Sequence, residues 1–337
     1  MTSGILPCIS RGSGPASILL IRTDRIGDVL VSTPVFRALR TRFPDARIDV
    51  LLGRHNASMA AALAAWGIGA HVYEKSPAGI IRLLLKARRS YDVVVDMMDN
   101  PSRTSSMLLR LLAPAWSVGF DNGRSHGVTH PVDLPDRSRV HIVECMTELL
   151  GPFGIDPAII DRRPAVPGLT PSHTPSHTPS HTIDILVHLS AGKESLWWGE
   201  TKFRELAGRL RGMYPEYRIA IGCAPEHRVV AARIEASCHV DVVPECASIL
   251  HYAERMMMAR MIVTPDTSVV HIASALSLPA VVLYAKPHPD RMVWTPYRTP
   301  SRTLIATDER GVTGITVDGV VDAVRSLHDE TGALGSR

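Results

Sequence analysis

The stretch Met261-Ile-Val-Thr-Pro-Asp-Thr-Ser-Val-Val-His-Ile-Ala-Ser-Ala-Leu276 passes from a short apolar run into a helical pattern. Residues 261–263 are predicted to form a buried strand, and Thr267 and Ser268 have the small hydroxyl side chains that favour a helix start. At such a turn, free backbone N–H groups and the positive end of the helix dipole point at the same place. The stretch therefore predicts an α/β fold with an anion-binding turn.

Strand-then-helix units recur along the whole chain. Strands are predicted over residues 18–21, 47–52, 72–73, 91–96, 183–188, 218–222, 240–243, 261–263 and 280–284. Helices are predicted after residue 28 and over residues 59–66, 79–88, 102–112, 200–212, 226–236, 248–259 and 317–328. This alternation predicts α/β architecture, with two Rossmann-like domains facing across a cleft and ligands at the carboxyl ends of the strands.

The domain boundaries follow from composition. Residues 1–17 are rich in Gly, Ser and Pro and are expected to be a flexible N-terminus. Residues 18–169 and 183–337 are the two expected domains. Between them, residues 170–182 repeat Pro-Ser-His-Thr three times, and a proline at every fourth position cannot join a helix or a central strand. This segment is expected to be a partly extended linker.

Bulk properties narrow the function. Of 337 residues, 45% are hydrophobic and 21% charged, which is typical of a soluble globular protein. The net charge of +4 comes without a long basic run, which disfavours a dedicated DNA-binding protein. Five scattered cysteines predict neither a disulfide framework nor a zinc site. No signal peptide is recognisable, and no window approaches the roughly 20 apolar residues of a membrane span, so we expect a cytoplasmic protein.

The first candidate site follows the first strand. In Thr23-Asp-Arg-Ile-Gly-Asp28, Gly27 permits a tight turn, and Asp28 lies at or near the start of the next helix. Asp28 is equally well explained as a helix cap or as a general base toward a hydroxyl group. The Gly-x-Gly-x-x-Gly fingerprint is missing, which disfavours a nicotinamide dehydrogenase.

Two further candidates lie in the second half. Ser190, Gly192 and Lys193 directly follow a strand and suit a phosphate, although the Walker spacing is absent and an ordinary surface loop is the alternative. In the opening stretch, Asp266 and His271 flank the two hydroxyl residues and face about the same side of the first turn. A structural role is the alternative for that histidine. Another strand end carries Glu226, a candidate nucleoside contact.

Three segments together resemble the heptosyltransferase family, glycosyltransferase family 9. They are Arg22-Thr-Asp-Arg-Ile-Gly-Asp-Val-Leu-Val-Ser-Thr-Pro34, then Ser190-Ala-Gly-Lys193 with Trp198, then residues 264–275, in the family's order. The resemblance implies a GT-B fold in which the first domain binds the acceptor and the second binds the donor. It also implies inverting transfer of heptose from ADP-heptose to the lipopolysaccharide core, with Asp28 as the base.

In the resemblance, Asp266, Thr267, Ser268 and His271 correspond to the donor site. Two positions depart from the family pattern. Leu196 stands where many members have a phosphate-binding lysine, and Lys193 is the expected replacement for that charge. Ser268 stands where many members have glycine. Both departures leave open which donor and acceptor are used.

The expected reaction needs neither metal nor cofactor, since no Asp-x-Asp motif lies in a plausible donor loop. The expected partners are a nucleotide-sugar donor and a lipid-linked or oligosaccharide acceptor, with peripheral contact at the inner membrane and no nucleic acid. A nucleotide-sugar epimerase and a non-catalytic sugar-nucleotide binding protein are the alternatives.

Overall fold

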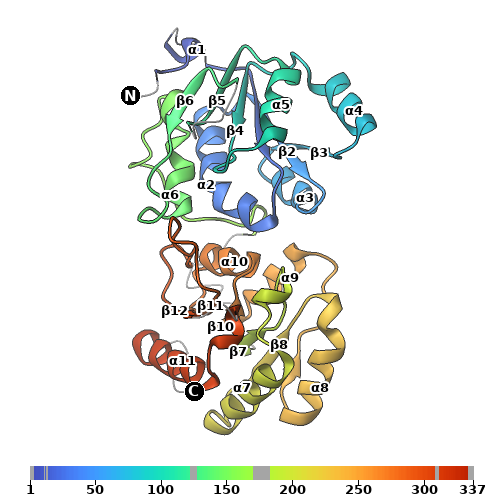
Figure 1. Cartoon of the computed structure of the whole chain (residues 1–337), viewed down its shortest axis with the longest axis vertical. Coiled ribbons are helices and arrows are strands. Elements are labelled where there is room, and N and C mark those ends of the chain that lie inside the picture. Colours follow the sequence, from blue (N-terminus) through green and yellow to red (C-terminus); the bar gives the residue numbers. More distant parts are fainter. Residues whose placement is uncertain are drawn as a thin grey trace. The chain divides into compact units, whose positions relative to one another are not determined.

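The computed structural model describes residues 4–10, 12, 14–121, 127–169, 183–307 and 311–332. The chain divides into two compact units, Met1–Gly168 and Leu169–Arg337 (Figure 1). The linker expected over residues 170–182 lies outside the described residues.

The first unit is a parallel sheet with helical crossovers. Its elements are α1 (Pro7–Ser10), β1 (Ser17–Arg22), α2 (Ile26–Arg42), β2 (Arg47–Gly53), α3 (Met59–Ala64), β3 (Gly69–Tyr73), α4 (Pro77–Ala87), β4 (Val93–Asp96), α5 (Arg103–Leu112), β5 (Trp116–Asp121), β6 (His130–Asp133) and α6 (Ile142–Glu148). Among the described residues, the strand order is β3-β2-β1-β4-β5-β6, with each neighbouring pair parallel. This is the Rossmann order.

The second unit has the corresponding arrangement. Its elements are β7 (Ile183–His188), α7 (Glu200–Met213), β8 (Ile219–Gly222), α8 (Arg228–Cys238), β9 (Asp241–Val242), α9 (Ile249–Met256), β10 (Ala259–Pro265), α10 (Ser268–Leu276), β11 (Ala280–Tyr284), β12 (Ser301–Ile305) and α11 (Val317–Thr331). Within the described residues, the strand order is β12-β11-β10-β7-β8-β9, again all parallel. The predicted α/β class with two Rossmann-like units is confirmed.

The central strands are apolar runs because both of their faces are covered. Residues 18–21 of β1 are completely buried, as are residues 261–263 of β10. Each sheet reverses its strand order at its centre, between β1 and β4 in the first unit and between β7 and β10 in the second. Ligands of open α/β sheets bind at such switch points, beside the carboxyl ends of the strands.

The structure corrects several expectations. The N-terminal segment was expected to be flexible, yet Leu6 is completely buried and its N–H donates to the carbonyl of Pro152 at 2.8 Å. Helix α2 begins at Ile26 and Asp28 lies within its first turn, which confirms the predicted position of Asp28 near the start of that helix. Elements β5, β6, β12 and α6 were not predicted.

A close backbone approach joins the ends of β1 and β2. A Cβ atom on Gly53 would lie 2.2 Å from the carbonyl oxygen of Thr23, so no larger residue fits without moving the loop after β1. The buried Asn56 side chain accepts from the Gly53 N–H at 2.8 Å and donates to the carbonyl of Arg22 at 2.9 Å. These contacts fix the backbone from which the Asp28 loop starts.

Replacing Gly53 with alanine should therefore lower the free energy of unfolding by about 1–3 kcal/mol, because backbone on both sides must shift. Gly212→Ala is the control. An added Cβ there meets no atom within 4 Å, and the exposed helix position should gain up to about 1 kcal/mol. Urea midpoints for both variants test this. Equal stability of Gly53→Ala and the wild type would contradict the strict steric requirement.

Candidate functional site

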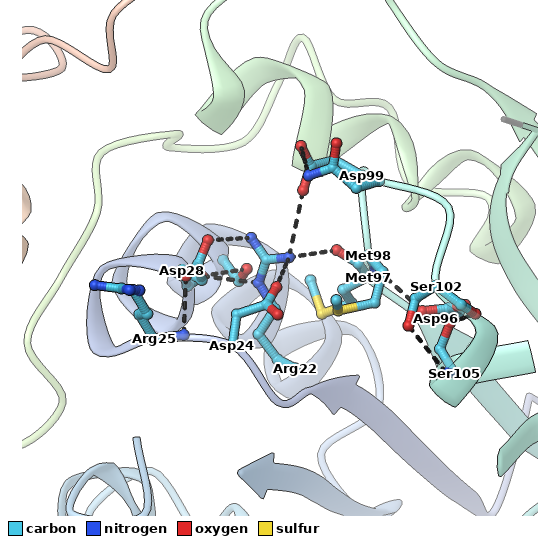
Figure 2. Close-up of polar contacts among 12 residues, drawn as sticks. Arg22, Asp24, Arg25, Asp28, Asp96, Met97, Met98, Asp99, Ser102 and Ser105 are labelled. Atoms are coloured by element: carbon cyan, nitrogen blue, oxygen red, sulfur yellow. Dashed lines mark hydrogen bonds and ion pairs between the residues drawn. The ribbon is translucent and has the colours of Figure 1, made fainter. Parts of the chain in front are cut away.

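The Arg22 side chain joins the two loops at the switch point of the first unit (Figure 2). Its guanidinium is completely buried, and Nη1 donates to the carbonyl of Met97 at 2.6 Å in the loop after β4. Nε donates to the carbonyl of Asp28 at 3.1 Å, and Nη2 lies 3.4 Å from the Asp28 carboxylate. A single buried charge thus holds the loops after β1 and β4 together.

Further carboxylates surround this guanidinium. Arg22 Nη1 lies 3.7 Å from Asp24 and 3.9 Å from Asp99, and Arg137 donates to the Asp99 carboxylate at 2.9 Å. Asp99 is buried, whereas the Asp24 side chain is 35% exposed. The sequence prediction missed this cluster. Its signal was a pair of acidic residues, Asp96 and Asp99, at the end of a strand that proves to be the neighbour of β1.

The crowded carboxylates alter the proton affinity of the cluster. Burial raises the pKa of Asp24 to about 6; Arg22 opposes the shift, and the negative charges of Asp28 and Asp99 add to it. Burial also raises the pKa of Asp96, although the Ser105 hydroxyl and a backbone N–H both bind its carboxylate. Burial therefore favours the protonated form of both Asp24 and Asp96.

Asp28 has a structural contact and remains partly open to solvent. Its Oδ2 accepts from the N–H of Arg25 at 2.9 Å, satisfying one of the free donors at the start of α2. Its Oδ1 faces Arg22, and the side chain is 14% exposed. The capping contact is present, but it leaves the carboxylate accessible, so capping and proton transfer are compatible roles.

The candidate residues of the second unit follow three adjacent strands. β10, β7 and β8 are parallel neighbours, so the turns after them share one edge of the sheet. Ser190 after β7 is buried; its Oγ accepts from the Ala224 N–H at 2.8 Å and lies 3.1 Å from His227 Nδ1. The Ser190–Lys193 loop is thereby tied directly to the turn that carries Glu226.

The departure from the family pattern at Leu196 has a structural explanation. Leu196 packs against the hydrophobic core of the second unit, as does Trp197. Lys193 is exposed and, within the described residues, has no ion-pair partner. Trp198 is 1% exposed and donates to the carbonyl of Ile315 at 3.0 Å, so it is a packing residue. The positive charge in this loop is therefore at position 193.

The turn after β10 is built around a helix cap. Thr267 is the N-cap of α10, and its hydroxyl accepts from the Val269 N–H at 3.2 Å. Asp266 and Ser268 are partly exposed on either side of it. His271 is 5% exposed, with its ring 6.0 Å from that of Trp294. The predicted strand-to-helix turn is confirmed, and His271 forms part of its buried wall.

A neutral pair that the sequence did not indicate lies beneath this edge. His188 Nδ1 is 2.7 Å from the hydroxyl of Tyr252, and both side chains are buried. Burial lowers the pKa of His188 to about 3, with His227 contributing, so its imidazole is neutral at pH 7. The two residues are far apart in sequence, on β7 and α9, and only the packing of α9 beside the sheet brings them together. The pair supports the strand ends without adding charge.

Within the described residues, no three His, Cys, Asp or Glu side chains gather closely enough to hold a metal ion. The helices of the same residues include none with the length and apolar character required to cross a bilayer.

Comparison with known proteins identifies the family. The family model for glycosyltransferase family 9 (heptosyltransferase) matches residues 81–311. The chain belongs to glycosyltransferase family 9. It is 22% identical to lipopolysaccharide heptosyltransferase 3 of Escherichia coli K12, over 92% of this chain and 98% of that protein. Among solved structures, E. coli heptosyltransferase WaaC with ADP-2-deoxy-2-fluoro heptose has a TM-score of 0.73 and 19% identity, with 92% and 99% of the two chains covered. E. coli ADP-heptose heptosyltransferase II has a TM-score of 0.68 and 20% identity, with 94% and 99% covered.

This glycosyltransferase has the GT-B fold class, as the sequence predicted. The family match includes the Ser190–Lys193 loop and the turn at Asp266, and it begins after Asp28. The roles of individual residues remain predictions that rest on their geometry.

Asp24 predicts a measurable pH dependence. Its folded-state pKa of about 6 lies above the ordinary value of 3.8. The folded protein therefore binds more protons between these values, and stability falls as pH rises through that window. Asp24→Asn should raise the melting temperature at pH 7.5 and leave it unchanged near pH 4. Asp45→Asn removes the same charge from an exposed site and is the control. An equal gain at both pH values would contradict the electrostatic explanation.

Proposed function

We propose that this enzyme is an inverting glycosyltransferase that moves heptose from ADP-heptose to a lipopolysaccharide core or a related glycan. The main support is the partly open carboxylate of Asp28, fixed by a buried Arg22 at the switch point of the first unit. The names of its relatives, which include lipopolysaccharide heptosyltransferase 3, support the substrate class.

In the proposed reaction, Asp28 accepts the proton of an acceptor hydroxyl as that oxygen bonds to the anomeric carbon of the donor. The bond from that carbon to the nucleoside diphosphate breaks, and the leaving group keeps the electron pair. Attack on the face opposite the leaving group inverts the anomeric centre. Arg22 is a positioning residue, because its contacts with the backbone and carboxylate of Asp28 hold the base in one orientation.

The second unit would hold the departing diphosphate. Lys193 is an exposed cation on a short loop, and the start of α10 offers backbone N–H groups at Thr267 and Ser268. The helix dipole adds positive potential at the same turn. These groups can balance the leaving-group charge, so we propose transfer without a metal ion or cofactor.

The nucleoside would lie near the turn after β8. Glu226 is exposed there and can accept hydrogen bonds from ribose hydroxyls. The Ser190 hydroxyl already binds the Ala224 N–H, so its proposed role is to position the loop. Asp266 and His271 would complete the wall around the diphosphate and sugar.

Asp28→Asn should reduce turnover about 10²-fold or more, the contribution expected of a general base, while ADP affinity is retained. The amide oxygen can still accept from the Arg25 N–H, so folding should persist. Initial rates with ADP-heptose and a core oligosaccharide, alongside ADP titration by calorimetry, test both parts. Wild-type turnover in the variant would exclude Asp28 as the base. A sugar product formed from donor alone, without acceptor, would instead indicate an epimerase.

Lys193→Ala should weaken ADP binding roughly tenfold, the scale of a lost charge-assisted contact. Arg204→Ala, on the exposed surface of α7, is the control because its partner is Glu200 on the same helix. Calorimetric titration in the presence of EDTA also tests metal independence. Unchanged affinity in Lys193→Ala would assign the diphosphate charge to another residue, and ADP binding or transfer that requires added magnesium would contradict the metal-free proposal.

A further inference from the structure

Helix α4 leaves two large apolar side chains in solvent. Leu85 is 83% exposed and Ile81 is 58% exposed. They lie four residues apart and therefore occupy the same face of the helix. The opposite face carries Leu83 and Ala87, which are buried in a core that also includes Leu108 of α5. The inner face is enough to hold α4 on the first unit, so the fold does not require apolar residues on the outer face.

Basic residues flank these apolar side chains. Residues 74–89 include five basic residues and a single acidic one, Glu74. Arg82 and Lys86 form an exposed row beside Ile81 and Leu85, and Arg82 lies 3.4 Å from Glu74. The outer face of α4 therefore combines protruding apolar groups with a local excess of positive charge.

The neighbouring edge of the sheet also carries an exposed apolar side chain. Val72 on the edge strand β3 is 49% exposed. A shallow hollow of about 110 Å³ between β3 and α4 is lined by Val72, Arg82 and Lys86, among others. We call Val72, Ile81, Arg82, Leu85 and Lys86 together the α4 surface.

We propose that the α4 surface docks the enzyme on the anionic headgroups of a lipid bilayer. Ile81 and Leu85 would enter the boundary between headgroups and acyl chains, as the apolar face of an interfacial helix does. Arg82 and Lys86 can lay their aliphatic stems on the same apolar layer and keep their charges at the lipid phosphates. The proposal rests on the proposed function, because a lipid-linked acceptor is presented at a membrane surface.

Charge favours a bilayer over a second copy of this chain. A two-fold contact between two α4 surfaces would oppose like charges from Arg82 and Lys86 on both sides, which is unfavourable. An anionic lipid surface has the complementary charge, and it accepts protruding apolar side chains without a matching pocket.

The test measures binding to vesicles, independently of turnover. Sedimentation compares vesicles of equal parts phosphatidylcholine and phosphatidylglycerol with vesicles of phosphatidylcholine alone. The wild type should bind the acidic vesicles and be released by high salt. The double variant Ile81→Ser/Leu85→Ser should lower the partition coefficient about tenfold or more, and Arg82→Ser/Lys86→Ser should lower it roughly tenfold.

Ile159→Ser is the matched control, since Ile159 is 81% exposed on the same unit and lies outside the α4 surface. It should bind vesicles as the wild type does. Melting temperatures should be unchanged in all variants, because the substituted side chains are exposed. The proposal is overturned if the wild type ignores acidic vesicles, or if Ile81→Ser/Leu85→Ser binds like the wild type or like Ile159→Ser. Light scattering that shows a dimer lost in Ile81→Ser/Leu85→Ser, with vesicle binding intact, would assign the α4 surface to a second copy.

Activity assays separate this proposal from the proposed function. Ile81→Ser/Leu85→Ser should keep wild-type turnover on a lipid-free acceptor oligosaccharide and lose turnover on the same acceptor embedded in vesicles. Vesicle binding that depends on the α4 surface, without transfer to any acceptor, would support docking and overturn the proposed function. Sugar transfer by an enzyme whose vesicle binding does not depend on the α4 surface would overturn the docking proposal and leave the proposed function intact.

Discussion

The first unit depends on the buried charge of Arg22. A guanidinium without access to water must be surrounded by acceptors, because an unpaired buried charge destabilises a fold by several kcal/mol. Its acceptors come from both loops at the switch point, the carbonyls of Met97 and Asp28 and the carboxylates near them. If either loop moved away, the buried guanidinium would lose acceptors and the fold would be destabilised. The position of Asp28 thus follows from the need of the Arg22 guanidinium for hydrogen-bond acceptors.

The second unit has the same strand order, but its strand ends are supported by neutral groups and not by a buried charge. Among the residues that the structure describes there, no buried arginine or lysine lies at the switch point. Neutral groups support the strand ends instead, namely Ser190 and the His188–Tyr252 pair. Lys193 is exposed, and it and the N–H groups at the start of α10 are the proposed contacts of the diphosphate. An acid-rich edge suits removal of a proton, and a cation beside a helix start suits a diphosphate. The two edges therefore match the two halves of the proposed transfer.

The sequence was informative wherever burial is local. The runs 18–21 and 261–263 predicted central strands because strands covered on both faces are continuously apolar. Strand β12 was missed because it lies at a sheet edge and its first three residues, Ser-Arg-Thr, are polar, so it contains no continuous apolar run. The Arg22 cluster was missed, since it requires β1 and β4 to be neighbours although β2 and β3 intervene in the chain. The need for glycine at position 53 was also missed, because it comes from the backbone of Thr23, which is distant in the sequence.

The same sheet connects the α4 surface to the candidate base. β3, β2 and β1 are hydrogen-bonded neighbours, and β2 is tied to the start of the Asp28 loop through Gly53 and Asn56. Helix α4 is held to this sheet by its own buried face. A bilayer contact at Leu85 would therefore set the orientation of Asp28 relative to the membrane without any hinge within the first unit. Exposed apolar residues on α4 would then act in acceptor capture, and their loss should affect the delivery of a membrane-bound acceptor while leaving the chemistry at Asp28 intact.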